Sequence, residues 1–346
     1  MRRNVARISE TDRWNSFDRF HQTTQTLSEL YEQAGARVEV TPIQTGRNLG
    51  DGHWAIQEAQ DIKGAVADIV SPVRERVLDY RVNPWHVVQW TAATPSRGLR
   101  CPLVIIDDEE ELDKMKVGAL QGAAVLTRLD IRAIMAKLDR KGAVAALVDR
   151  PVPNNPDAVA WVKFGWGAVP LDRAPANIVG FVVSQRQGQR LRRLQRRHGR
   201  LTLHLKVDSR MYVGHHDVVC GVVEGAQDPQ DEVWAFAHSA EPGALDNASG
   251  CALTIEIARI LEDLFASGAL PRPRRSIRLV NGYECYGLFG YLERVGRQHP
   301  PLAGVNIDTI GSKAAVCNGR LEWHSTVPMS AGFVDWIGEK LSLIHI

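Results

Sequence analysis

Four side chains that could bind a metal ion occur in the C-terminal half of the sequence, each at or just beyond the end of a predicted strand: His238, Asp246, Glu284 and Asp308. In open α/β sheets the carboxyl ends of the strands meet at one crevice, so we expect these residues to converge although they are far apart in sequence. One imidazole with several carboxylates is a ligand set suited to zinc. Taken singly, each could be a solvated loop residue or a helix cap, and Asp246 fits the N-cap of a helix starting near Ala248.

The elements that must position these residues alternate between strands and helices. The expected strands are 233–237, 276–280 and 302–307, and the expected helices run through 253–264 and 288–295. The first strand is a continuous apolar run, which is typical of a parallel sheet buried on both faces. This order predicts an α/β fold with a doubly wound, mostly parallel sheet and right-handed crossovers.

The N-terminal half has a different texture. Apolar residues at helical spacing predict a helix over 16–34, and alternation predicts a strand over 37–40. From about 50 to 205 the sequence is rich in strand-like runs broken by Gly and Pro, which predicts a separate β-rich domain. Its clearest runs are 102–106, 142–148 and 178–183.

Composition limits the class of protein. With 346 residues, 44% hydrophobic and 24% charged, the chain is expected to form two domains, or one α/β domain with an insert, rather than a disordered chain. No apolar run approaches the roughly 18 residues of a membrane span, and no secretory signal is visible, so we expect a cytoplasmic protein without a membrane partner. The five cysteines include no CxxC pair, which argues against a disulfide framework or a zinc ribbon.

An arginine-rich stretch, 185–200, holds seven arginines and no acid, although the net charge of the whole chain is only +2. Such a stretch could bind nucleic acid, but no aromatic residues interleave for base stacking. Leu191 and Leu194 lie three apart, which favours an amphipathic helix with its arginines on the solvated side. We therefore do not expect a nucleic-acid partner.

Three segments resemble the zinc aminopeptidase family that includes bacterial leucyl aminopeptidases and glutamate carboxypeptidase. Residues 237–250 read AHSAEPGALDNASG and 306–311 read NIDTIG, and 256–278 is also similar to the family. The middle region resembles the protease-associated insert of many members. The implied organisation is an N-terminal segment of the peptidase domain (1–49), the insert (50–205), the zinc peptidase core (206–340) and a tail (341–346).

The resemblance implies a role for each matching residue. His238 binds one metal, Asp246 bridges two, and Asp308 binds the other. Glu284 is the general base, which takes a proton from the attacking water. Cys285 stands where the family has a further metal-binding Glu, and thiolate is itself a zinc ligand, although a small buried hydrophobe is the favoured alternative.

Further departures concern the support of these ligands. The family often has Asp two residues after the first His, where this chain has Ala240; Glu241 is expected to take that supporting role. The family's last ligand is a His far downstream, for which His324 lies too early. His345 lies in the tail LSLIHI, which matches one translation of a common transposon sequencing adapter. We therefore expect the natural sequence to diverge after Lys340, and the peptidase core to be incomplete.

The resemblance implies a metal-dependent exopeptidase, most plainly an aminopeptidase, that acts on peptide substrates with up to two zinc ions. It also implies a cis peptide bond between Asp246 and Asn247, with Asn247 beside the ligands. Two alternatives stay open: a catalytically inactive homologue that acts as a binding module, and a one-metal enzyme similar to glutaminyl cyclases. Homo-oligomer formation also stays open.

Overall fold

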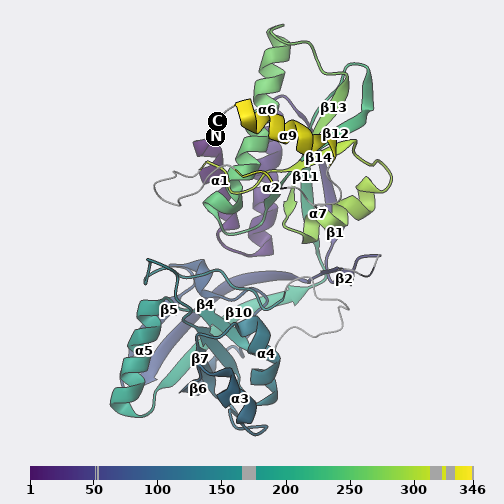
Figure 1. Cartoon of the computed structure of the whole chain (residues 1–346). Helices are drawn as coiled ribbons and strands as arrows, with labels where there is room; N and C mark the ends of the chain where they lie inside the picture. The colour runs from purple at the N-terminus through teal and green to yellow at the C-terminus, as the bar shows by residue number, and fades with distance from the viewer. Residues whose placement is uncertain (51, 53, 166–176, 312–321, 325–331, 345–346) are drawn as a thin grey trace. The chain divides into compact units, whose positions relative to one another are not determined.

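The structure is a computed structural model that describes residues 1–50, 52, 54–165, 177–311, 322–324 and 332–344 (Figure 1). The chain divides into two units, each with its own sheet. The first unit comprises Met1–Asp12, His21–Ile43 and Asp217–Ile346, and the second comprises Arg13–Phe20 and Gln44–His216.

The first unit is built on a five-stranded sheet with the order β1-β11-β13-β12-β14. Its strands are β1 (Arg37–Gln44), β11 (His215–Val223), β12 (Asp228–Ser239), β13 (Arg275–Tyr283) and β14 (Ala303–Asn306). Strand β12 runs parallel to both β13 and β14, whereas β11 runs antiparallel to β13. The predicted α/β sheet is confirmed, and the antiparallel strand makes it a mixed one.

Helices cover both faces of this sheet. They are α1 (Arg2–Asp12), α2 (Phe17–Gln33), α6 (Ser249–Ala266) and α7 (Tyr286–Tyr291), which is followed by a helical turn (Leu292–Gly296). A further helix, α9 (Phe333–Ile344), has its large apolar side chains mostly exposed. Leu279 of β13 packs in a buried cluster with residues of α1, α2 and α6. Its neighbour Arg278 points to the opposite face, where it donates to the hydroxyl of Tyr291 on α7. This two-sided cover is the doubly wound arrangement expected from the alternating elements.

Close backbone approach sets the position of α2 on the sheet. A Cβ atom at Gly221 of β11 would overlap the ring of Tyr31, which is fully buried. The Tyr31 hydroxyl donates to Asn281 of β13 at 2.6 Å and lies 2.8 Å from the hydroxyl of Thr254 on α6. Glycine at this position therefore lets an N-terminal helix pack directly on β11 and reach β13, whose Asn281 follows Tyr31 by 250 residues.

The second unit contains a seven-stranded sheet with the order β5-β4-β10-β6-β7-β8-β9. Its strands are β4 (Ala59–Ser71), β5 (Glu75–Asp79), β6 (Leu99–Ile105), β7 (Ala124–Thr127), β8 (Ala145–Val148), β9 (Val179–Val182) and β10 (Thr202–Tyr212). A short ladder joins β2 (Arg47–Asn48) to β3 (Ala55–Ile56), and Pro84–His86 forms a helical turn. The boundary expected at residue 205 falls inside β10, which pairs with β4 along its whole length.

This second unit is not made of strands alone. Strands β6, β7, β8 and β9 are parallel, and the unit also contains the helices α3 (Glu109–Lys114), α4 (Ile131–Arg140) and α5 (Gln185–His198). The apolar runs expected as strands lie in this parallel half, where burial on both faces removes the alternation of an antiparallel strand.

The arginine-rich stretch forms the amphipathic helix α5, as predicted, with Leu191 and Leu194 buried. A capping box between Ser184 and Gln187 begins it. The expectation that its arginines face solvent is wrong for Arg192, which is buried.

Two carboxylates explain the burial of Arg192. Its guanidinium pairs with Asp149, which is itself fully buried, at 2.7 Å and also with Asp107. Arg186 and Arg190 pair with Asp157 and Glu75 of the same unit. Three arginines of the arginine-rich stretch therefore form ion pairs within the second unit.

None of the helices in the described part of the chain is long and apolar enough to cross a bilayer. The four described cysteines, Cys101, Cys220, Cys251 and Cys285, are free thiols. Cys317 lies outside the described residues.

Candidate metal centre

His238 is the residue on which the candidate centre converges. It is the second-last residue of β12. The strand is therefore longer than the predicted 233–237, and His238 lies within it rather than after it. The ring is buried, with its residue 3% exposed. Its Nε2 atom lies 3.2 Å from Oδ1 of Asp246 and 3.4 Å from Oδ2 of Asp308, and its Nδ1 atom lies 3.4 Å from Oε2 of Glu241.

Strand register brings these segments together. His238 lies opposite Gly282, close to the end of β13, and Phe236 lies opposite Asn306, the last residue of β14. Asp308 comes two residues after that strand end. The convergence at the carboxyl edge of the sheet therefore follows from parallel pairing of β12 with both neighbours.

The turn Ala244–Ala248, between β12 and α6, places Asp246. Asp246 and Asn247 depart from helical dihedral angles, and the peptide bond between them is cis, as predicted. A Cβ atom at Gly243 would overlap the carbonyl of Asp246, so only glycine fits there.

Asn247 joins the two segments that carry the carboxylates. Its Nδ2 atom donates to the carbonyl of Ile307 at 2.9 Å, and its Oδ1 atom accepts from the amides of Gly250 and Thr309 at 3.0 and 3.2 Å. The Asn247 side chain thus takes part in three hydrogen bonds, which hold Ile307 and Thr309, on either side of Asp308, near the start of α6.

The electrostatics of the centre favour a cation. Burial opposes the charge of His238, but hydrogen bonds to Asp246 and Asp308 outweigh that cost and raise the pKa of the imidazole to about 10. The hydrogen bond to His238 also lowers the pKa of Asp308. In the metal-free protein the two carboxylates therefore stabilise a proton on the atom where a metal would bind.

The donor set fits zinc. In a tetrahedral site with bonds of about 2.0–2.1 Å, neighbouring ligand atoms are about 3.3–3.4 Å apart. The distances from His238 Nε2 to the oxygens of Asp246 and Asp308 are close to this value. One metal-capable atom from each of these three residues lies within 4.8 Å of the others.

Glu284 follows β13 directly and is half-buried. Its carboxylate forms a second group with His238 and Glu241, again with the ligand atoms within 4.8 Å of one another. Cys285 caps the start of α7 with a φ of 53°, and among the described residues it belongs to neither group. The structure thus brings Glu284 and Glu241 to the centre and leaves Cys285 outside these groups.

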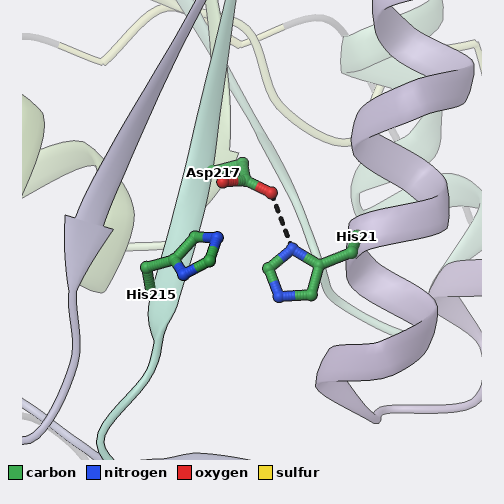
Figure 2. Close-up of side chains that lie close together, drawn as sticks. All are labelled: His21, His215 and Asp217. Carbon is green, nitrogen blue, oxygen red and sulfur yellow. Dashed lines mark hydrogen bonds and ion pairs between the residues drawn. The ribbon is translucent and has the colours of Figure 1, made fainter.

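Other histidines lie elsewhere. His324 is exposed and pairs with Glu322 at 3.0 Å, and His345 lies outside the described residues. Figure 2 shows a separate pair within the first unit, in which His21 Nδ1 of α2 lies 2.6 Å from Oδ2 of Asp217 on β11. His215 comes two residues earlier on the same strand, and so on the same side of it.

One buried residue near the centre was missed by the sequence analysis. Asp12, the last residue of α1, accepts a hydrogen bond from the amide of Ala240 at 3.0 Å. The partners are 228 residues apart, and a single Asp at a helix end carries no signal of such a contact.

The model of peptidase family M28 matches residues 207–317. This segment is similar to peptidases of family M28. The resemblance to zinc aminopeptidases is thereby confirmed, and all four residues of the predicted constellation lie within the M28 segment.

Curated relatives are aminopeptidases by name. Aminopeptidase NAALADL1 from Mus musculus is 31% identical over 135 residues, which is 37% of this chain and 17% of the mouse protein. The Rattus norvegicus protein of that name is 37% identical over 92 residues, or 26% of this chain and 12% of its own. The matches thus span less than a fifth of either relative.

Solved structures share the fold. A zinc aminopeptidase from Bacillus subtilis, BSAP, has a TM-score of 0.60 at 15% identity, covering 90% of this chain and 68% of its own. An M28 peptidase precursor from Shewanella amazonensis has a TM-score of 0.57 at 16% identity, covering 86% and 71%. At these identities the likeness establishes the fold.

Proposed function

We propose that the chain is a zinc-dependent exopeptidase, and specifically an aminopeptidase. The observation that carries the proposal is the convergence of His238, Asp246 and Asp308 on one point inside the M28 segment. The names of the curated relatives support aminopeptidase over other peptidase activities.

Each residue has a chemical role in this proposal. His238, Asp246 and Asp308 would hold the metal. Zinc bound there would polarise the scissile carbonyl and lower the pKa of a water from 15.7 to about 7. Glu284 would take the proton from the attacking water and transfer it to the leaving amine, as general bases in hydrolases do. Its place beside His238 and Glu241 supports that role.

The second unit is proposed to be an insert of the protease-associated type. The chain leaves the first unit after Ile43 and returns to it at Asp217, and between them it builds a separate seven-stranded sheet. For the number of zinc ions, the described residues provide two groups of possible ligands that share His238, which supports at least one ion.

Hydrolysis of aminoacyl arylamides by the zinc-loaded chain tests the activity. We expect chelator-sensitive release of the arylamine, and a fall of about 10²–10⁴-fold in kcat for Glu284→Gln with zinc content unchanged. Glu111→Gln, at an exposed position on α3, is the matched control and should retain full activity.

Two other outcomes would each replace the proposal. Zinc binding without hydrolysis of any aminoacyl arylamide would favour an inactive homologue that acts as a binding module. Conversion of a peptide with N-terminal glutamine to its cyclised form, without arylamide hydrolysis, would favour the one-metal cyclase.

A further inference from the structure

Asp12 is a carboxylate buried inside the first unit. It is 0% exposed and lies at the end of α1, a helix whose other residues are mostly solvent-accessible. Thr23 of α2 donates to its Oδ1 atom at 2.5 Å, and the hydroxyl of Thr23 lies 2.6 Å from that of Thr11. A buried carboxylate is costly unless its hydrogen bonds compensate, so the contacts of Asp12 need an explanation.

The second contact of Asp12 is to the segment that carries the candidate metal ligand. Its Oδ2 atom accepts from the amide of Ala240, two residues after His238 and one before Glu241. Ala240 has a φ of 60°, in the left-handed region that residues with a side chain rarely adopt. Such a conformation persists only where the surrounding structure holds it.

The hydrogen bond from the Ala240 amide to Asp12 affects how His238 and Glu241 lie relative to each other. Ala240 links the imidazole of His238 to the carboxylate of Glu241, and these two side chains face each other at 3.4 Å. If the backbone at Ala240 relaxed out of its left-handed conformation, the side chain of Glu241 would move away from His238. The side chain of Ala240 is only a methyl group, so the carboxylate that holds the turn of residues 238–241 comes from α1.

We propose that Asp12 is a positioning residue for the metal centre, which holds the His238–Glu241 turn through the Ala240 amide. The inference rests on the proposed function only for the identity of the ion, which we take to be zinc. In this proposal α1 does more than pack against the sheet, because it carries the carboxylate that accepts from the amide of Ala240, 228 residues later in the chain.

Three variants separate positioning from stability. Asp12→Ala removes the acceptor. Asp12→Asn keeps it, because the amide oxygen can accept from Ala240 while its NH₂ group donates to Thr23, whose hydroxyl then donates to Thr11. Ile8→Ala removes a fully buried side chain from the same helix and leaves the Asp12 carboxylate in place.

Zinc affinity of the metal-free chain, measured by competition with a chelator, is the first readout. Residues that orient metal ligands typically change affinity by about 10–100-fold, and we expect a loss of that size for Asp12→Ala. Asp12→Asn and Ile8→Ala should stay close to the parent protein. Equal zinc affinity in Asp12→Ala and the parent, or an equal loss in Ile8→Ala, would overturn the proposal.

Hydrogen exchange of the Ala240 amide is the second readout and needs no metal. We expect protection in the parent and in Asp12→Asn, and its loss in Asp12→Ala alone. If the parent protein bound no zinc, the proposed function would fail, and this pattern would still decide whether Asp12 holds the turn. Unchanged protection in Asp12→Ala would refute that.

Discussion

Replacing Asp12 by Asn should make the stability of the metal-free protein less dependent on pH. Burial raises the pKa of this carboxyl from 3.8 to about 7, although hydrogen bonds from Thr23 and Ala240 and the charge of His238 oppose the shift. In the unfolded chain the group titrates near its ordinary value. Between these two values the native state binds a proton that the unfolded state has lost.

The sign and size follow from proton linkage. Because the folded pKa lies above the unfolded one, the contribution of Asp12 to stability is largest below pH 4 and falls as pH rises toward 7. A shift of about 3 units at 1.36 kcal/mol each gives a loss of about 4 kcal/mol over that range. This is a large part of the 5–15 kcal/mol by which a domain is usually stable.

The assay is urea unfolding of the chelator-treated parent and Asp12→Asn at pH 4 and pH 7.5. Other groups titrate in this window, including His86, whose pKa is lowered mainly by burial and whose effect has the opposite sign. Groups that do not interact with Asp12 are common to both proteins and cancel in the difference, whereas the charge of His238 is coupled to Asp12. We expect Asp12→Asn to gain about 4 kcal/mol on the parent between the two pH values. A difference that does not change with pH would refute the argument from burial.

Three further substitutions test other parts of the structure. Asp149→Ala should cost about 3–5 kcal/mol in urea unfolding, because it leaves the buried guanidinium of Arg192 short of a partner. Gly221→Ala should cost about 1–3 kcal/mol, because its new methyl group would overlap the ring of Tyr31. Cys285→Ser should leave zinc affinity unchanged in a chelator competition, because among the described residues the thiol lies outside both groups at the centre.

Controls for these changes are substitutions at positions that lack the contacts in question. Arg193→Ala, on the exposed side of α5, and Gly64→Ala, where a Cβ atom meets nothing within 4 Å, should change stability by less than about 0.5 kcal/mol. If Asp149→Ala or Gly221→Ala were as mild as its control, the packing argument at that position would fail. A marked loss of zinc by Cys285→Ser would place the thiol at the metal.

The sequence was informative where local pattern and topology agree. Continuous apolar runs mark buried parallel strands, and their order places His238 and Asp308 at one edge of a sheet before any distance is known. The helix α2 was predicted within one residue at each end, because its apolar residues recur at helical spacing.

What the sequence could not show depends on contacts between distant segments or on weak local patterns. The helix α1 (RRNVARISETD) has few apolar residues, so its periodicity is faint although Ile8 is fully buried. The burial of Arg192 depends on acids 43 and 85 residues away, and the contact of Asp12 depends on a turn even further along the chain. No local pattern identifies such partners.

The central claim is that His238 is the focus of a zinc site, and zinc titration of the metal-free chain against a chelator tests it directly. We predict that the parent and His299→Ala, a change at an exposed histidine, bind zinc equally. His238→Ala removes the atom on which both carboxylates converge, and should weaken binding beyond the roughly 100-fold that supporting residues can cause. Equal zinc affinity in His238→Ala and the parent, or no zinc binding by the parent, would contradict the account.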